Sequence, residues 1–181
     1  MDKNIFKALS VEEEHRNCWY EGNYCKLHDI AYQSEEEYEQ HPEVTHHYIA
    51  FDQITDWGMP CKKLMVAINP DTLCQFTGKV DNNSKCIWEH DIVKVTNTYN
   101  NPATVLWYVV RYLPGAGAFA YTDPKELMYC SMADFHDKCI IEVVGNEFDT
   151  PELLNNIKSQ TPEEYMEEMA EVARKLGIIN D

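Results

Sequence analysis

The clearest shortage in this sequence is of positive charge. Its 181 residues include 15 lysines and arginines against 31 aspartates and glutamates, which gives a net charge of −16 and a sequence pI near 4.7. Proteins that bind DNA or RNA neutralise phosphates with lysine and arginine, and the same charges attract an anionic membrane surface. We therefore expect no membrane binding and no direct binding of nucleic acid. The carboxylates fit a solubilising surface, or a surface that imitates the charge of DNA.

Paired cysteines are also lacking. The sequence has no C-x-x-C pair, and its seven irregularly spaced cysteines are Cys18, Cys25, Cys61, Cys74, Cys86, Cys130 and Cys139. A secreted disulfide framework usually has an even count, and a structural zinc site needs closely spaced ligands. Several of the seven lie in apolar runs, where a reduced thiol behaves as a small hydrophobic side chain. The sequence predicts seven reduced, metal-free thiols in a cytoplasmic protein.

Long apolar runs are missing as well. No stretch approaches the roughly 20 residues that a transmembrane helix needs, and residues 1–6 do not resemble the apolar core of a signal peptide. A hydrophobic content of 44% is nevertheless too high for wholesale disorder. We expect a soluble chain that folds without a metal or a disulfide.

Short segments of β-type composition fill most of the chain. Eleven tyrosines and four tryptophans favour strands. The expected strands are 19–27 (broken into two by Gly22 and Asn23), 45–51, 64–68, 73–76, 86–88, 91–96, 104–112, 117–121 and 139–148. Turn residues separate them at 81–84, 97–102 and 114–115. Short strands punctuated this often indicate a small barrel rather than βαβ units.

Helical signals are fewer. Ser10 and Glu13 form a capping pair for a short helix or turn, residues 34–42 are a charged helix or loop, and a short helix is expected over 151–158. The strongest signal covers 162–176, where Thr161 is the N-cap and an apolar stripe recurs every three or four residues. A helix of 15 residues is marginal alone in water, so we expect the stripe to pack on its own barrel or, slightly preferred, on a neighbouring subunit.

No catalytic or metal-binding motif emerges. Gly115 to Ala120 matches the dinucleotide pattern G-x-G-x-x-A, but Asp123-Pro124 prevents the long helix that this motif needs, so we interpret it as a turn. His46 and His47 are adjacent on a strand and point to opposite faces, which disfavours a metal site with His41. Residues 134–137 (DFHD) read as an acidic loop, not a base with its orienting carboxylate.

Two further groups of residues, a cysteine pair and a set of aromatic side chains, are more simply explained by ordinary packing. No basic residue lies near both Cys18 and Cys25 to lower both of their pKa values, so a redox role is disfavoured. Six aromatic residues could form a stacking platform for a peptide or single strand, although core packing is the simpler interpretation. They are Trp88, Trp107, Tyr108, Tyr112, Phe119 and Tyr121.

Three ordered blocks of the sequence follow a known pattern. Residues 69–78 (NPDTLCQFTG) resemble the segment V-D-P-E-T-V-x-Q-Y-T-G, and residues 85–93 (KCIWEHDIV) are similar to K-x-I-Y-E-G-D-I-V. Residues 142–154 (EVVGNEFDTPELL) are similar to E-V-I-G-N-I-Y-E-N-P-E-L-L, and residues 19–24 match the opening W-V-Y-G-D-L more loosely. Together these blocks resemble the YopX family of phages and prophages; the resemblance runs from about Asn17 to Leu154 and contains no catalytic motif.

The resemblance implies a phage-related origin, an SH3-like barrel preceded by a smaller α+β portion, and a tendency to self-associate. Two departures stand out. Asn82-Asn83-Ser84 replaces the family's Asn-Gly turn, and His90 replaces a Gly or Asn before Asp91. Both positions are ones where a positive φ is expected, which Asn tolerates better than His.

We therefore predict an α+β, mainly β fold. Residues 1–68 form an N-terminal α+β portion, residues 69–150 a small, partly open SH3-like barrel, and residues 151–181 a helical extension. Ile87, Ile92, Val105, Val143 and Phe148 are expected to share the barrel core.

The expected function is that of a non-enzymatic, phage- or prophage-encoded accessory protein in the host bacterial cytoplasm. It would act through protein–protein contacts and form a homo-oligomer, with no catalytic, cofactor-binding or metal-binding residues and no cofactor. The alternative is an acidic DNA mimic that inhibits a nucleic-acid-binding host protein.

Overall fold

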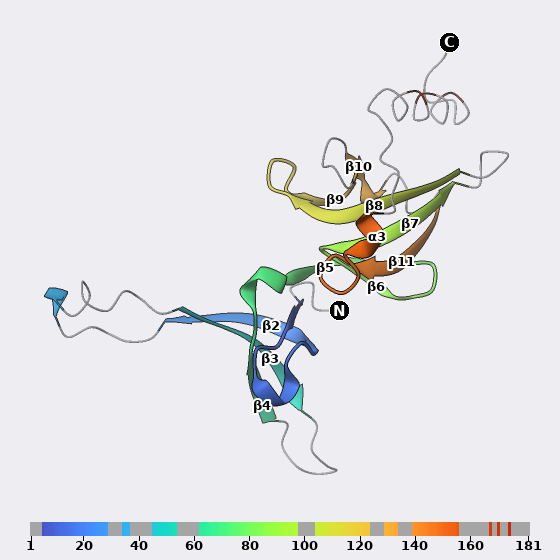
Figure 1. Cartoon of the computed structure of the whole chain (residues 1–181). Helices are drawn as coiled ribbons and strands as arrows, with labels where there is room; N and C mark the ends of the chain where they lie inside the picture. The colour runs from blue at the N-terminus through green and yellow to red at the C-terminus, as the bar shows by residue number, and fades with distance from the viewer. Residues whose placement is uncertain are drawn as a thin grey trace. The chain divides into compact units, whose positions relative to one another are not determined.

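The computed structural model describes residues 5–28, 34–36, 45–53, 62–97, 104–123, 129–133 and 139–155, together with residues 167, 170 and 174. The chain divides into two compact units, Met1–Phe76 and Thr77–Asp181. Each is built from antiparallel strands with little helix, which confirms the mainly β class (Figure 1). The finer domain division at 68/69 and 150/151 remains a prediction.

The first unit is a curled antiparallel sheet. Its strands are β1 (Phe6–Leu9), β2 (Trp19–His28), β3 (Thr45–Gln53), β4 (Lys62–Ala67) and the start of β5 (Cys74–Val80). Their order is β4-β3-β2-β1-β5. Ser10 forms a bridge with Ile68, and the Asn69 N–H donates to the Leu9 carbonyl at 2.9 Å. This contact joins the end of β4 back to the end of β1, so the sheet is closed at these residues.

The interior of the first unit is small and aromatic. Ala8 and Ile49 are fully buried and Ile68 nearly so. The partly buried side chains packed around them are Phe6, Tyr20, Tyr24, Phe51 and Leu73. The Tyr20 and Phe51 rings lie 5.5 Å apart between centroids, a spacing typical of favourable aromatic pairs.

The expected break at Gly22 and Asn23 is wrong. Strand β2 continues through Gly22 as a single element of ten residues. A Cβ atom at position 22 would lie 2.3 Å from the carbonyl oxygen of Ala50, so glycine is the residue that lets β3 approach this closely. Here glycine marks a close backbone approach and not a turn.

The second unit is built around a five-stranded sheet. It holds the end of β5, β6 (Cys86–Trp88), β7 (Asp91–Asn97), β8 (Thr104–Leu113), β9 (Ala118–Thr122), β10 (Tyr129–Ser131), β11 (Ile140–Asn146) and α3 (Glu152–Asn155). The order is β10-β9-β8-β7-β11, and β5 pairs with β6.

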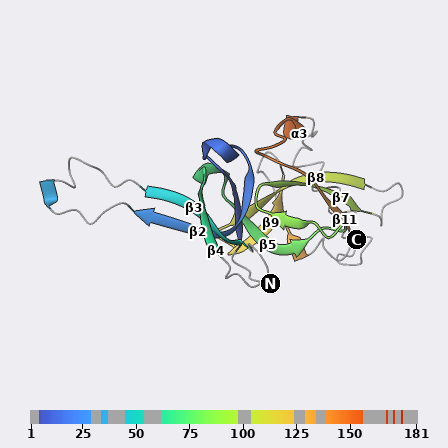
Figure 2. The same cartoon turned by 90° about the horizontal axis from the view of Figure 1, so that it is seen from below.

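The two faces of this sheet differ in what covers them. On the face that we call the core face, Val93, Val95, Tyr108, Val110, Tyr121 and Ile141 form one buried cluster with Ile87 of β6. On the opposite face, here the outer face, α3 lies over β11 (Figures 1 and 2), and the Leu153 side chain approaches Gly145.

The predicted core is only partly right, because side chains alternate between the two faces of a strand. Ile87 is a member of the core cluster, and Val143 packs against it. Ile92 is fully buried but lies on the outer face, since its neighbour Val93 points to the core. Val105 also lies on the outer face and is 44% exposed. Phe148 follows β11 in a turn and lies outside the cluster.

The short helices agree in place with the sequence signals, but the capping pair does not. A 3-10 turn, η1, covers Glu13–His15, and its N-cap is Glu12. The Ser10 hydroxyl accepts from the Glu12 N–H at 3.1 Å, so Ser10 stabilises the bend before η1 and is itself buried in the sheet closure. Residues 35–36 are helical, and so are residues 167, 170 and 174. The rest of the predicted helix 162–176 lies outside the described residues, so the helical tail and the SH3-like type remain predictions.

Candidate functional site

Two turns from matched blocks that are far apart in sequence meet in the second unit. One is the turn between β6 and β7, which contains Asp91, and the other follows β11 and begins at Asn146. The Asp91 side chain is 1% exposed; its Oδ2 accepts from the Trp88 N–H at 2.8 Å and its Oδ1 from the Asn146 amide at 3.0 Å. A buried carboxylate is stable only when such donors satisfy it. Asp91 therefore ties the two turns together.

A cluster of His90, Arg111 and Glu147 lies beside this tie. Arg111 Nη2 donates to Glu147 Oε1 at 2.7 Å, and Arg111 Nη1 contacts Oε2 of the same carboxylate. His90 Nδ1 lies 2.8 Å from Glu147 Oε2. The three side chains are 17–27% exposed, so the cluster is partly screened from solvent.

The electrostatics of the cluster favour an ionised carboxylate. Burial alone would raise the pKa of Glu147, but hydrogen bonds from Arg111 and His90, together with their charges, outweigh it and hold that pKa at about 2. Both carboxylate oxygens are occupied by the guanidinium, which is the strongest geometry that an arginine offers. A carboxylate held in this way is a poor acid or base near neutral pH. We interpret the cluster as a tie between β8 and the turns at 88–91 and 146–150.

Both departures from the family pattern fall at positions of left-handed backbone, His90 beside this cluster and Ser84 in the turn between β5 and β6. His90 has φ of 65° and Ser84 has φ of 66°, which confirms that both positions require the left-handed region. His90 gains the contact with Glu147 that a glycine could not make, and its ring lies 5.1 Å from that of Phe148.

The turn between β5 and β6 covers the free edge of β11. Asn82 Oδ1 accepts from the Ile141 N–H at 2.6 Å, and the Asn82 N–H donates to the Ile141 carbonyl at 3.0 Å. Asp81 Oδ2 accepts from the Val143 N–H at 3.0 Å. Burial would raise the pKa of Asp81, but its hydrogen bonds from the backbone of Val143, Lys85 and Asn83 lower it overall. The groups that face away from β7 are thus satisfied by the turn, and no further strand can pair there.

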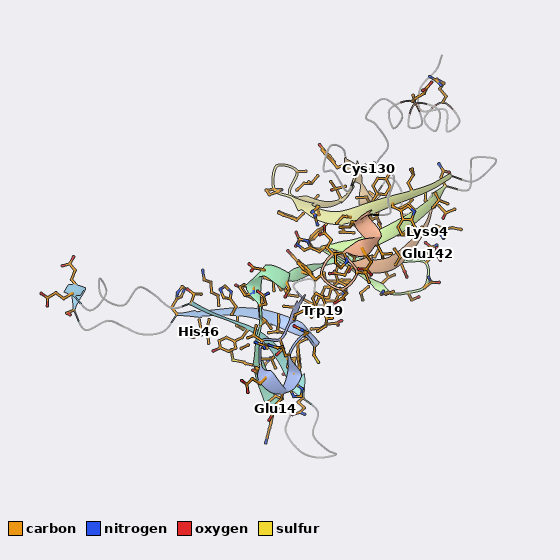
Figure 3. The ribbon with its side chains drawn as sticks, in the orientation of Figure 1. Glu14, Trp19, His46, Lys94, Cys130 and Glu142 are labelled. Carbon is orange, nitrogen blue, oxygen red and sulfur yellow. The ribbon has the colours of Figure 1, made fainter. Side chains whose placement is uncertain are left out.

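The part of the outer face away from α3 carries exposed apolar side chains. Ile140, Thr96 and Val105 lie directly opposite one another on β11, β7 and β8. Ile140 is 42% and Val105 44% exposed. The next row holds Trp107 with Lys94 and Glu142, whose side chains lie together on neighbouring strands and form an ion pair of 3.1 Å (Figure 3). We use the name apolar row for Ile140, Thr96 and Val105 together with Trp107 of the adjacent row.

The candidate residues weighed from sequence do not assemble into a chemical site. His47 Nδ1 lies 2.5 Å from the Tyr24 hydroxyl, whereas His46 lies on the other face of β3. His41 and residues 134–137 lie outside the described residues. Among the described residues, no group of three or more His, Cys, Asp or Glu side chains is arranged to hold a metal. The G-x-G-x-x-A segment is a hairpin turn followed by β9, with Gly117 at φ 61°.

The six aromatic residues do not form one platform. Tyr108, Tyr121 and Trp88 are buried, which agrees with the packing interpretation. Trp107 lies on the outer face, opposite to Tyr108. Tyr112 and Phe119 form an edge-to-face pair, 5.3 Å between centroids, at one end of the core face.

The polar ties were missed by the sequence reasoning, although part of the signal was available. His90 and Glu147 lie within two of the matched blocks. His90 comes just before one expected strand and Glu147 near the end of another, at positions where a polar side chain is not needed to pack the core. Arg111 had no comparable signal, because an arginine within a strand is ordinarily a solvated side chain.

Six of the cysteines are described, and none of these is in a disulfide; Cys61 lies outside the described residues. Nor does any helix within the described ranges have the length and apolar character to cross a bilayer.

The comparison with known families agrees with the resemblance of the three blocks. The model of the family described as YopX protein matches residues 10–155, which includes every block and both of the turns joined by Asp91. No curated protein matches the chain. Because the family match covers most of the sequence, the chain belongs to the YopX protein family.

Proposed function

We propose that this protein is a non-enzymatic accessory protein, encoded by a phage or prophage, that acts through protein–protein contacts in the cytoplasm of its bacterial host. The observation that carries the proposal is the apolar row on the outer face of the five-stranded sheet. Its two aliphatic members are more than 40% exposed and lie in register across three strands.

The composition of the row supports a protein partner. Tryptophan and large aliphatic side chains are enriched in the buried centre of protein interfaces, and charged side chains form the rim. Trp107 lies next to Val105 in this arrangement, and the Lys94–Glu142 pair borders the row. A partner that covers it would remove Ile140 and Val105 from water, each a gain of about 1 kcal/mol at half exposure.

The family supports the same conclusion indirectly. Residues that it shares with this chain, such as Asp91 and Asn146, build turns and ties. In this chain the His90–Arg111–Glu147 cluster, whose His90 and Glu147 depart from the quoted family segments, holds its carboxylate in a form unsuited to proton transfer. Self-association through the row is one form of the proposal, since a second copy presents the same surface. The alternative is that the acidic chain, with its net charge of −16, occupies the nucleic-acid site of a host protein.

The experiment is site-specific photo-crosslinking in host cells. A photoreactive amino acid replaces Val105, and as a matched control it replaces Ala116, which is exposed in the turn between β8 and β9. We expect an adduct of defined mass from position 105 alone, which Ile140→Lys abolishes without lowering the melting temperature.

Mass spectrometry of the adduct separates the forms of the proposal. A second copy of the chain indicates a homo-oligomer, another protein indicates an accessory complex, and a nucleic-acid-binding protein indicates mimicry. Equal adducts from positions 105 and 116, or an adduct that Ile140→Lys leaves intact, would contradict a role for the row.

A further inference from the structure

Strand β4 of the first unit has an outer edge that is only partly covered. The Ile68 N–H donates to the His47 carbonyl at 3.0 Å, which makes Ile68 and His47 a hydrogen-bonded pair. In an antiparallel ladder such pairs alternate, so Val66 and Leu64 also bond to β3. The N–H and C=O groups of Ala67, Met65 and Lys63 therefore point away from β3.

The chain itself covers the first of these three residues. The Val11 N–H donates to the Ala67 carbonyl at 3.0 Å, and Glu12 Oε1 accepts from the Ala67 N–H at 3.0 Å. Ser10 and Val11 thus begin a neighbouring strand for β4. That strand stops at once, because the chain bends into η1 (Figure 3, beside Glu14).

The next two residues are left at the edge. Within the ranges that the structure describes, no group hydrogen-bonds to the outward N–H and C=O of Met65 or Lys63. The Met65 side chain is 44% exposed, whereas Val66, which faces the interior, is 7% exposed. The edge thus offers four backbone groups in line with the segment that ends at Val11.

The side chains at this edge set the charge of what can pair with it. Lys62 and Lys63 are consecutive, so they point to opposite faces and flank an added strand on both sides. Lys63 Nζ lies 3.3 Å from Oδ1 of Asp52 on the neighbouring strand β3, and both side chains are largely exposed. The two lysines thus give this end of the edge its positive charge, whereas Glu12 lies at the other end, beside Ala67.

We infer that the Lys63–Met65 edge of β4 binds an extended segment of a partner protein as an added antiparallel strand, with acidic residues opposite Lys62 and Lys63. Strand addition takes its affinity from backbone hydrogen bonds and its specificity from the side chains on either face. A second copy of this chain is a poorer occupant, since two bodies of charge −16 repel and the shared edge is only a few residues long.

The free protein provides the first test, because hydrogen exchange reads each amide separately. The amides of Lys63 and Met65 should exchange within minutes, whereas those of Leu64 and Val66 should be protected by β3. Protection of all four in the full chain at low concentration would show that the edge is already covered, and would overturn the inference.

The second test titrates labelled protein with a blocked seven-residue peptide in which two consecutive Glu residues, one for each face of the strand, lie among Val residues. The control is its counterpart with Lys in place of Glu. We expect shifts confined to β4 and its neighbours, and an affinity roughly fivefold or more higher for the Glu peptide, from two cross-strand charge pairs. Equal affinity of the two peptides, or shifts elsewhere in the chain only, would refute the assignment.

A pair of variants separates the backbone edge from a merely charged surface. Met65→Pro removes the outward N–H but none of the bonds to β3, and proline is tolerated on edge strands. Met65→Thr alters the side chain and keeps the N–H. Loss of peptide binding in the proline variant alone, with both variants folded by circular dichroism, supports strand addition. Binding retained by Met65→Pro would overturn it, and if that variant unfolds, the exchange test above decides.

Discussion

Gly145 is a position where a single added methyl group should be strongly destabilising. Its register partner is Ile92, and it lies under the turn that carries α3. A Cβ atom there would lie 2.2 Å from Thr150 Oγ1 and 2.8 Å from Leu153 Cδ1. The Thr150 hydroxyl cannot yield freely, because it accepts from the Asn146 N–H at 3.2 Å and donates to the Asn146 carbonyl at 3.1 Å.

The size of the expected destabilisation follows from the contacts that the added methyl group must break. Breaking the two hydrogen bonds of the hydroxyl costs about 0.5–1.5 kcal/mol each, and overpacking against Leu153 adds roughly 1–3 kcal/mol. We expect Gly145→Ala to lower the free energy of unfolding of the second unit by about 2–6 kcal/mol. In a chain of this length each kcal/mol lowers the melting temperature by about 2–4 °C.

The assay is urea denaturation followed by tryptophan fluorescence, with Gly115→Ala as the matched control. Gly115 has no atom within 4 Å of the added methyl group, so that variant should be neutral or more stable by up to about 1 kcal/mol. Thr150→Ala should couple with Gly145→Ala, since removing the hydroxyl relieves the closest contact. Equal stability of the two glycine variants, within about 0.5 kcal/mol, would refute the reasoning.

Four further predictions use the same structure. The pKa of Glu147 is depressed from 4.5 to about 2, so its ionised form contributes up to about 3 kcal/mol to the free energy of unfolding. This contribution is present above pH 4.5 and is lost as the pH falls towards 2, and Glu147→Gln should flatten this part of the plot of urea midpoint against pH. His90→Gly should be more stable than His90→Ala by about 1 kcal/mol in urea melts, because only the glycine relieves the positive φ while both lose the contact with Glu147. Deletion of residues 159–181 should lower the molar mass in light scattering if the tail joins subunits, whereas unchanged mass with a lower melting temperature would show packing within one chain. Thiol titration under denaturant should return seven free thiols, and a stoichiometric zinc signal would contradict it.

The strands were predictable where side chains alone decide them. Turn residues marked the ends of β6 and β7, and the aromatic and β-branched run marked β8. Face assignment failed at Ile92, because both faces of β7 are buried near its start, and at Val105 of β8, because alternation alone does not say which face is inside. Gly22 was misread because its reason lies in Ala50, a residue of another strand.

The ties between turns were harder to predict for a similar reason. The ties join residues far apart in sequence, as with Asp91 and Asn146 or Arg111 and Glu147. A pattern within one segment shows that His90 sits at a turn, but not which partner it meets. The edge of β4 escaped notice too, since its exposure depends on where the chain turns away after Val11.

Among the described residues β11 is the last strand in chain order, yet it is bordered on both sides: β7 pairs with one edge, and the Asp81–Lys85 turn meets the other. Until it emerges from the ribosome, Asp91 lacks the Asn146 amide, one of the two donors to its carboxylate described above. The second unit therefore cannot complete this tie during synthesis before Asn146 has cleared the exit tunnel, whereas the first unit ends at Phe76. A nascent chain stalled in between should present one finished unit followed by a segment that chaperones and proteases recognise as unfinished.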